Sequence, residues 1–321
     1  MKKTFVENLR AGDVVDDVFV LVDKHMAQKR NGENFLNITL ADRTGRIKGV
    51  VWDQVEAING LSDAGDFVFT KGSVSEYKGM LQLVVKGMER CAEGTVEPVD
   101  FLPATARDVD KMMARLKEMT ATLRTPHLKK LFELFWADSE FSDAFKTAPA
   151  AKKMHHAYLG GLLEHTLSMT LLADMIAGHY GGVDRDMLIA GAILHDVGKI
   201  REFEYARKID YTDEGRLVSH IVIAVEMLNQ KIGQIDAFPE EHARLLKHMI
   251  ISHHGMREFG SPEPPKTIEA VLLHYIDEID SKVNGIREFM AAEDTGESWT
   301  AYHRLLERHF YKGSTKPNGE K

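Results

Sequence analysis

The sequence predicts a multidomain protein of mixed class, in which a small N-terminal five-stranded β-barrel precedes an all-α helical bundle. Three observations lead to this prediction. Short runs of β-branched and aromatic residues, separated by turn residues, fill residues 1–97. Apolar residues recur at helical spacing from about residue 98 onward. Eleven of the 15 histidines fall between His155 and His274, which favours a metal or proton-transfer site in the helical part.

The composition limits the class of protein and its partners. The chain has 321 residues, enough for two domains, and a net charge of −8, so no global basic field attracts nucleic acid. Cys91 is the one cysteine, which excludes an intrachain disulfide and a thiolate zinc cluster. The N-terminal residues lack the apolar core of a signal peptide, and no apolar run approaches the roughly 20 residues of a membrane span. We therefore expect a cytoplasmic protein with no membrane partner.

Five short strands are expected in the N-terminal segment. In the second of them, Leu36, Ile38 and Leu40 alternate with polar neighbours and therefore share one face. A turn over 41–45 joins this strand to the next, and a short helix over 54–60 lies between the third and fourth strands. Five strands so spaced suit a small closed barrel. The expected strands are residues 18–22, 35–40, 47–52, 66–71 and 81–85.

The stretch Leu-Asn-Ile-Thr-Leu-Ala-Asp-Arg-Thr-Gly, which begins at Leu36, resembles OB-fold modules that bind single-stranded nucleic acid. Such modules stack bases on aromatic rings and hold the backbone with cations. Because 1–97 carries 13 Lys/Arg against 15 Asp/Glu, we expect a weak guiding surface. Simple packing of the aromatic residues, or protein contacts, are the alternatives. The candidate nucleic-acid-binding residues are Phe35, Trp52, Tyr77, Arg43, Arg46 and Lys48, with Lys29, Arg30, Lys71 and Lys78 as further cations.

Residues 98–150 are expected to form a helical connector that packs on the second domain. The stretch 97–103 contains two prolines and is typical of a linker. Methionines and a leucine then recur at helical spacing from Met112 to Met119, and we expect this stripe to be core. Another helix is expected to begin near Thr125.

The second domain, residues 151–311, is expected to be a bundle of long apolar helices, followed by a flexible tail over 312–321. A first helix continues from residue 151 through Gly160 and Gly161, whose missing side chains would allow a close approach. Asp184 is expected to cap the next helix. Further helices are expected over 216–231, from Pro239 to 255, and over about 265–290.

Polar groups interrupt these apolar helices in a recognisable order. His195 and Asp196 end a helix side by side, where they could share a divalent ion, and Lys199 could face a phosphate bound to that ion. The plainer alternative is a histidine that caps the helix carbonyls. The other groups weigh against that alternative, because a histidine precedes the pair, and a histidine, a His-His pair and an aspartate follow. The complete set is His165, His195, Asp196, His220, His253, His254 and Asp277.

This order resembles the HD-domain phosphohydrolases, and the chain as a whole resembles the YhaM family of 3′-5′ exoribonucleases. The resemblance implies two divalent ions, with Mn²⁺ favoured and Fe, Co or Ni as alternatives that fit the donor atoms. Sequence does not say whether His253 or His254 is the ligand, and the family pattern favours Asp277 over Asp280. The first ion would be held by His165, His195, Asp196 and Asp277, and the second by His220, His253 or His254, and a bridging Asp196.

The implied activity is the hydrolysis of single-stranded RNA from its 3′ end to 5′-monophosphates, with single-stranded DNA left open as a second substrate. The expected mechanism is attack of a metal-activated hydroxide on phosphorus, with Asp196 in the metal centre and Lys199 steadying the non-bridging oxygens. His156 or its neighbour His155 would contact phosphate or donate a proton, unless both are ordinary helix-end histidines. The direction of degradation comes from the resemblance alone.

Two other functions are compatible with the same residues. An HD phosphodiesterase that acts on small or cyclic nucleotides would have the same metal centre. A non-catalytic RNA-binding scaffold could retain the donors as a relic, although the complete donor set with Lys199 argues against it. Single-stranded RNA is the expected partner, and a homo-oligomer is left open.

Overall fold

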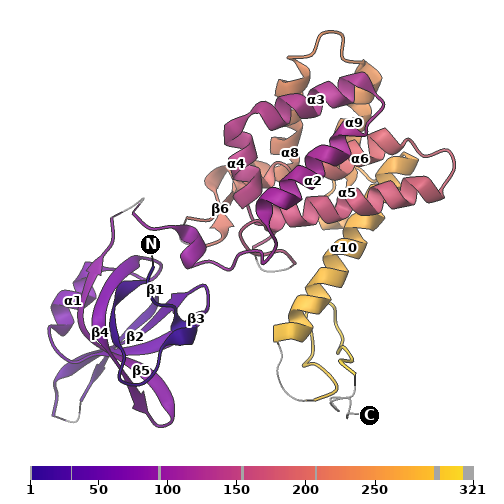
Figure 1. Ribbon diagram of the computed structural model, residues 1–321. Helices are drawn as coiled ribbons and strands as arrows, with labels where there is room; N and C mark the ends of the chain where they lie inside the picture. Colours follow the sequence, from indigo (N-terminus) through magenta and orange to yellow (C-terminus); the bar gives the residue numbers. More distant parts are fainter. Residues whose placement is uncertain are drawn as a thin grey trace. The chain divides into compact units, whose positions relative to one another are not determined.

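The computed structural model describes residues 2–29, 31–92, 95–152, 155–206, 208–292 and 297–313. The chain divides into two compact units (Figure 1). The first comprises Met1–Ala106 and Glu204–Asp210, and the second comprises Arg107–Phe203 and Tyr211–Lys321. Arg30, one of the candidate cations, and residues 314–321 of the expected tail lie outside the described residues.

A closed barrel of five strands forms most of the first unit, as the sequence predicts. The strand order is β1-β2-β3-β5-β4, with β3 and β5 parallel and the other neighbours antiparallel. Leu36, Ile38 and Leu40 point into the core, so the alternation in the second strand was interpreted correctly. The strands are β1 (Val14–Gln28), β2 (Asn34–Asp42), β3 (Gly45–Val51), β4 (Phe67–Tyr77) and β5 (Met80–Arg90).

All five strands are longer than the sequence predicts, and β1 differs most. β1 has 15 residues where five were expected, because its charged second half pairs with β2 while its first half pairs with β4. Charged residues on the outer side of a strand hide the apolar alternation on which the prediction rested. The expected short helix is confirmed as α1 (Val55–Leu61), which buries Val55 and Ile58 in the barrel core.

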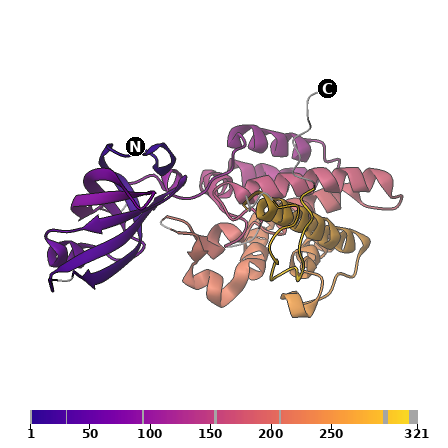
Figure 2. The same ribbon diagram turned by 90° about the horizontal axis from the view of Figure 1, so that it is seen from below.

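Helices form the second unit. Figures 1 and 2 show α5 and α6 side by side, with α10 extending past them, and α5 packs against both. The helices are α2 (Val109–Ala121), α3 (Pro126–Ala137), α4 (Ser139–Thr147), α5 (Gly161–His179), α6 (Arg185–Leu194), α7 (Lys199–Glu202), α8 (Asp213–Ile232), α9 (Glu240–Ser252) and α10 (Ile268–Ala292). Three short 3-10 turns, η1 (Val6–Asn8), η2 (Pro98–Asp100) and η3 (Arg257–Phe259), and a two-stranded ribbon, β6 (Phe203–Glu204) with β7 (Asp210–Tyr211), complete the elements.

The apolar stripes of the connector lie in the core of this unit. The methionine stripe of α2 is buried from Met112 to Met119, as expected. The Asp184 carboxylate accepts a hydrogen bond from the Met187 backbone N–H at 3.0 Å and caps α6, which confirms that prediction. No helix in the described part of the chain is both long and apolar enough to cross a membrane.

Several helix boundaries differ from the prediction, and two helices depart from it where the backbone is unusual. The helix expected from residue 151 begins only at Gly161, because Gly160 before it adopts a left-handed conformation with φ +77°. A Cβ on Gly161 would lie 2.1 Å from the His156 carbonyl oxygen, so the predicted close approach is to the preceding turn. Helix α8 begins at Asp213 and is kinked at Ser219, whose φ of +72° redirects the chain just before His220.

Candidate metal centre

Five helical elements bring the predicted donor residues to one place in the core of the second unit. Most of these side chains are almost fully buried, with His195 0% and Asp196 2% exposed. Such burial is costly for a polar group without a partner. The donors come from α5 (His165), the turn after α6 (His195 and Asp196), α8 (His220), the C-terminal end of α9 (His253 and His254) and α10 (Asp277).

A first group of donors surrounds His165. Its Nε2 lies 3.2 Å from His195 Nε2 and 3.4 Å from Asp277 Oδ1. Asp196 Oδ2 lies 3.3 Å from His195 Nε2. One ligand atom from each of His165, His195 and Asp277 lies within 4.8 Å of the others, close enough to share an ion.

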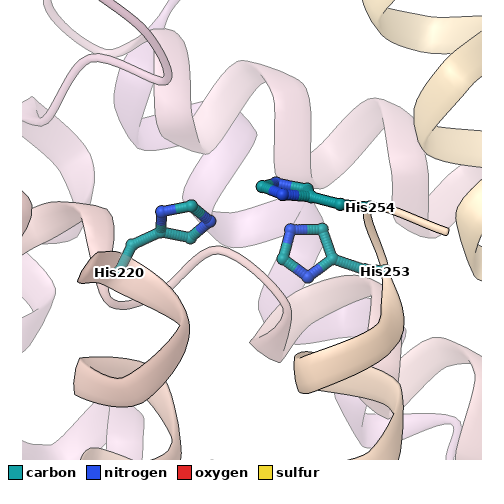
Figure 3. A group of neighbouring side chains, drawn as sticks. All are labelled: His220, His253 and His254. Carbon is teal, nitrogen blue, oxygen red and sulfur yellow. The ribbon is translucent and has the colours of Figure 1, made fainter. Parts of the chain in front are cut away.

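A second group consists of His220, His253 and His254, whose ring nitrogens also lie within 4.8 Å of one another. Figure 3 shows the three rings facing one another, from α8 on one side and the end of α9 on the other. Asp196 Oδ1 lies 3.5 Å from His220 Nε2 and 3.6 Å from His253 Nε2. The two oxygens of Asp196 therefore face different groups, as a bridging carboxylate would.

Hydrogen bonds fix the orientation of all five imidazole rings. In each ring Nδ1 is bonded to an oxygen that can only accept, so Nδ1 carries the proton and a neutral ring has its lone pair on Nε2. When both rings are neutral, the Nε2 atoms of His165 and His195 face each other and each carries a lone pair. Neither nitrogen has a proton to donate, so the two cannot form a hydrogen bond. The Nδ1 partners are Asp280 for His165 (2.8 Å), Ala192 O for His195 (3.0 Å), Glu202 for His220 (2.8 Å), Ile250 O for His253 (2.6 Å) and Phe259 O for His254 (3.0 Å).

Buried atoms without a partner gather at the second group. Among the described residues, Asp196 Oδ1, His220 Nε2 and His253 Nε2 are buried and have no hydrogen-bond partner. Several unsatisfied polar atoms at one point in a core are unusual and need an explanation. Imidazole nitrogens and carboxylate oxygens without thiolates suit first-row divalent ions. The residues at this place therefore fit a metal centre.

The pKa shifts of His253 and Asp196 also suit metal binding. Burial, followed by the neighbouring His254 and His195, lowers the pKa of His253 well below its usual value. Burial alone would raise the pKa of Asp196, but Lys199 and His195 hold it well below its usual range. A neutral imidazole and an ionised carboxylate are the forms that bind metal.

Asp277 and Asp280, which are one helical turn apart on α10, have different surroundings. Asp277 Oδ1 faces His165 Nε2 within the first group. Asp280 accepts from His165 Nδ1 at 2.8 Å and from His156 Nε2 at 3.2 Å, and it also accepts from the Ser168 hydroxyl. His156, His165 and Asp280 are close enough to hold an ion themselves, but their atoms already pair as donors and acceptors. Asp280 therefore orients His165, an outer-shell role known from other metal sites.

Two residues that sequence reasoning missed hold His220 in place. The Glu202 carboxylate is buried and accepts from both the backbone N–H (3.1 Å) and Nδ1 (2.8 Å) of His220. A Cβ on Gly198 would lie 2.0 Å from the His220 carbonyl oxygen, so only glycine lets this turn approach α8 so closely. Glu202 gave no sequence signal, because its partner lies 18 residues away on another helix.

The remaining predicted residues of this unit lie at the edge of the centre. Lys199 Nζ is 2.6 Å from Asp196 Oδ2, which places its charge beside the first group. Both ring nitrogens of His156 already have partners, because Nδ1 bonds the Tyr158 hydroxyl (2.7 Å) and Nε2 contacts Asp280. His155 has a buried Nδ1 with no partner among the described residues, and its ring lies 5.9 Å from that of His165. Both rings lie near His165, and of the two it is His155 that keeps a ring nitrogen without a partner among the described residues.

On the barrel, the predicted nucleic-acid residues are at least partly exposed. Phe35 and Trp52 stack with ring centroids 5.0 Å apart, and Lys29 Nζ lies 5.2 Å from the Trp52 ring. Trp52 is 42% exposed and Tyr77, at the β4–β5 turn, is 58% exposed. Arg46 and Lys48 alternate outward on β3. Arg43 lies in the β2–β3 turn, where its guanidinium packs against the protein itself, 4.5 Å from the Phe5 ring.

A hollow of about 330 Å³ lies in the outer surface of the barrel. Its lining includes Asp23, Thr39, Lys48 and Gln82, which the strand register places side by side across β1, β2, β3 and β5. His25 and Asn37 form the neighbouring pair on the side of Phe35. Aromatic rings beside a polar, partly basic hollow are a surface on which a nucleic-acid strand could lie.

Both units match known families. The HD domain family matches residues 162–282, and the OB-fold nucleic acid binding domain family matches residues 20–90. Among solved structures, a domain of replication protein A from Methanococcus maripaludis is 18% identical and covers 27% of this chain and 92% of its own, with a TM-score of 0.24. The fold and the donor set define an HD-domain protein, of the metal-dependent phosphohydrolase class, with an OB-type barrel in front.

The particular family follows from relatives that match nearly the whole chain. The 3′-5′ exoribonuclease YhaM of Geobacillus sp. (strain WCH70) is 32% identical over 308 residues, which cover 96% of this chain and 94% of the relative. The protein of the same name from Bacillus subtilis (strain 168) is 34% identical over 304 residues, covering 94% and 95%. The chain belongs to the YhaM family of 3′-5′ exoribonucleases.

Proposed function

We propose that this protein is a metal-dependent 3′-5′ exoribonuclease that hydrolyses single-stranded RNA to nucleoside 5′-monophosphates. The observation that carries the proposal is the pair of donor groups that meet at the two oxygens of Asp196. Membership of the YhaM family supports the substrate and the direction of degradation. The site supports the reaction class, because centres with two divalent ions are typical of phosphodiester hydrolysis.

In this proposal each ion has its own ligands and Asp196 is shared. His165, His195, Asp277 and Asp196 Oδ2 would hold one ion. The second would be held by His220, His253, His254 and Asp196 Oδ1, so both members of the His-His pair are ligand candidates. Bound there, divalent ions supply Lewis-acid chemistry that lowers the pKa of water and neutralises charge on a phosphate.

The protein's own groups orient the reaction around these ligands. Asp280 and Glu202 fix the rings of His165 and His220, so the Nε2 lone pairs point inward before any substrate arrives. Lys199 lies beside Asp196, where its ammonium would face the non-bridging oxygens of a bound phosphate. The unpartnered His155 Nδ1 is a candidate contact to the same phosphate, in place of His156.

The barrel would guide the strand toward the active site. Bases would stack on the Phe35–Trp52 pair, with Lys29 and Lys48 beside the backbone. Three finer expectations stay predictions: Mn²⁺ as the ion, single-stranded DNA as a second substrate, and a homo-oligomeric assembly.

The test uses an RNA oligomer labelled at its 5′ end and a chain stripped of metal by chelation. With Mn²⁺ restored, we expect a ladder of shortening products and release of 5′-monophosphates. The double variant His195→Ala/Asp196→Ala should lose this activity. His179→Ala is the matched control, because His179 is an exposed histidine at the end of the helix that carries His165. It should degrade RNA as the wild type does.

Three results would contradict the proposal. Unchanged degradation by His195→Ala/Asp196→Ala would remove the metal centre from the reaction. Internal cleavage products would exclude an exonuclease. Rapid hydrolysis of a cyclic dinucleotide, with no action on RNA, would favour the alternative of a small-nucleotide phosphodiesterase with the same centre.

A further inference from the structure

The C-terminal residues 297–313, shown in yellow in Figure 1, form a small ribbon in which two isolated β-bridges, Trp299–Tyr311 and His303–Arg308, join two antiparallel segments. Backbone hydrogen bonds join these segments, including Thr300 N–H to Phe310 O at 2.9 Å and His303 N–H to Arg308 O at 2.8 Å. The inner side of the ribbon is anchored on α10. His303 is 8% exposed, and its ring lies 4.5 Å from that of Phe289 on α10.

The outer side of the ribbon carries two pairs of rings. Trp299 and Tyr311 lie opposite each other, with centroids 5.0 Å apart, and Tyr302 and His309 form a second pair at 5.4 Å. Trp299, Tyr302 and Tyr311 are each more than half exposed. A cluster of large, solvent-exposed aromatic side chains is typical of an interaction site.

The local charge indicates which partner such a surface suits. Residues 297–313 carry Arg304, Arg308 and Lys312 against Glu297 and Glu307, a net charge of +1 (3 − 2) within a chain of net −8. Leu305 is the one large exposed aliphatic side chain in this described stretch. Aromatic rings with interleaved cations are the combination that binds single-stranded nucleic acid, by base stacking and contact with phosphates.

We propose that the aromatic ribbon, defined by Trp299, Tyr302, His309 and Tyr311, is a second binding site for the RNA strand, in the same unit as the metal centre. The proposal rests on the proposed exoribonuclease function. Neither family match, over 20–90 or 162–282, includes these residues. Bases upstream of the 3′ end would stack on the two ring pairs, and the arginines would contact the backbone.

The geometry of α10 sets the length of RNA that can use this site. Asp277 in the metal centre and Phe289 under the ribbon are 12 residues apart on one helix. At 1.5 Å per residue this is about 18 Å, which corresponds to roughly five nucleotides of a stacked strand at 3.4 Å each. An RNA trimer whose 3′ end lies at the metal centre therefore cannot reach the ribbon, whereas a dodecamer can.

The experiment measures binding of a labelled trimer and a labelled dodecamer to the full chain by fluorescence anisotropy. Mn²⁺ is present and both RNAs carry hydrolysis-resistant phosphorothioate linkages, so that the 3′ end can occupy the metal centre without being cleaved. The double variant Trp299→Ala/Tyr311→Ala should bind the dodecamer at least about tenfold more weakly, since stacking is lost, and the trimer as well as the wild type does. Trp299→Phe/Tyr311→Phe keeps the ring faces and should restore affinity. Tyr180→Ala, which removes a ring that is 55% exposed elsewhere in the same unit, is the matched control and should bind both RNAs normally.

Each other outcome overturns the inference. An alanine double variant with wild-type affinity for the dodecamer, or with equal losses on both RNAs, would exclude a remote stacking site. A changed subunit number in sedimentation equilibrium would mean that the rings contact a second copy of the chain instead. Trimer hydrolysis by the wild type with metal restored tests the exoribonuclease function separately, because it does not depend on the ribbon.

Discussion

The metal centre and the outer surface of the barrel present their functional side chains in opposite ways. At the centre most of the donors are buried, and a hydrogen bond at Nδ1 fixes each of the five rings. On the barrel, Trp52 and Tyr77 are about half exposed, and the contacts of Trp52 are to one ring and one lysine. Reacting groups must be held to within a fraction of an ångström, whereas a surface that guides a flexible strand tolerates adjustment.

This difference predicts different responses to substitution. A change at the metal centre leaves another buried group without its partner, so its effect should be large. A change on the barrel removes one stacking or charge contact among several, so its effect should be small and graded. The predictions below test this contrast, beginning with the largest effect.

Asp196→Asn should give the greatest loss. It keeps the size of the side chain but removes the charge whose oxygens face both donor groups. We expect RNA hydrolysis to fall at least about a thousandfold, the equivalent of about 4 kcal/mol of transition-state stabilisation. Initial rates on a trimer measure the loss without any contribution from distant binding sites. Hydrolysis at more than a tenth of the wild-type rate would show that Asp196 is not at the reacting centre.

The variants Asp277→Asn and Asp280→Asn should have different effects on metal binding. Asp277 is the proposed metal ligand, whereas Asp280 orients a ligand. Asp280 contacts His165 Nδ1 and not the Nε2 that faces the other donors, so its substitution should weaken metal binding about 10–100-fold while both ions still bind. Asp277→Asn should instead abolish binding of one ion. Calorimetric titration with Mn²⁺ measures both effects. The reverse result, with one ion lost only in Asp280→Asn, would exchange the two assignments.

Trp52→Ala should have a moderate effect that depends on RNA length. Loss of one stacked base costs about 1–3 kcal/mol, so a long RNA should bind roughly tenfold more weakly, while turnover of a trimer should not change. Because Trp52 stacks on Phe35, the double variant with Phe35→Ala should lose less than the sum of the single losses. Anisotropy and KM on long RNA are the measurements. Strict additivity would mean that the two rings do not act as one platform.

Lys48→Gln should have the smallest effect on RNA affinity. The effect is best measured as a change in the salt dependence of binding. Lys48 is exposed and lines the hollow of the barrel, so it would contact a phosphate and release a counterion on binding. The slope of log affinity against log salt should become shallower by about 0.7. Lys130→Gln is the control, because Lys130 is an exposed lysine on α3, outside the barrel. An unchanged slope for Lys48→Gln would remove this lysine from the binding surface.

Local sequence signals identified most of the fold. β-branched runs marked the five strands of the barrel, and helical spacing marked the core face of α2. The order of histidines and aspartates marked the donors, because these residue types are unusual within apolar helices. The same signals failed where charge masks a pattern, as in the second half of β1, and where the backbone is unusual, as at Gly160 and Ser219.

Contacts between distant parts of the chain could not be predicted in this way. The hydrogen bonds of Asp280 to His165 and of Glu202 to His220 join residues 115 and 18 positions apart. No local sequence pattern around these residues predicts them. For the same reason the sequence did not separate His155 from His156, although His156 Nδ1 bonds the Tyr158 hydroxyl and His155 Nδ1 has no partner among the described residues. The residue types in the sequence indicated which side chains could bind metal. Only the folded structure showed which other side chains orient them.

The most direct test of the account is the number of Mn²⁺ ions bound by the metal-stripped chain in calorimetric titration. We predict two ions per chain for the wild type, and one for the variant His220→Ala/His253→Ala, which removes donors of the second group only. No binding by the wild type, or unchanged binding by that variant, would contradict the claim that the converging Nε2 atoms and Asp196 form the metal centre.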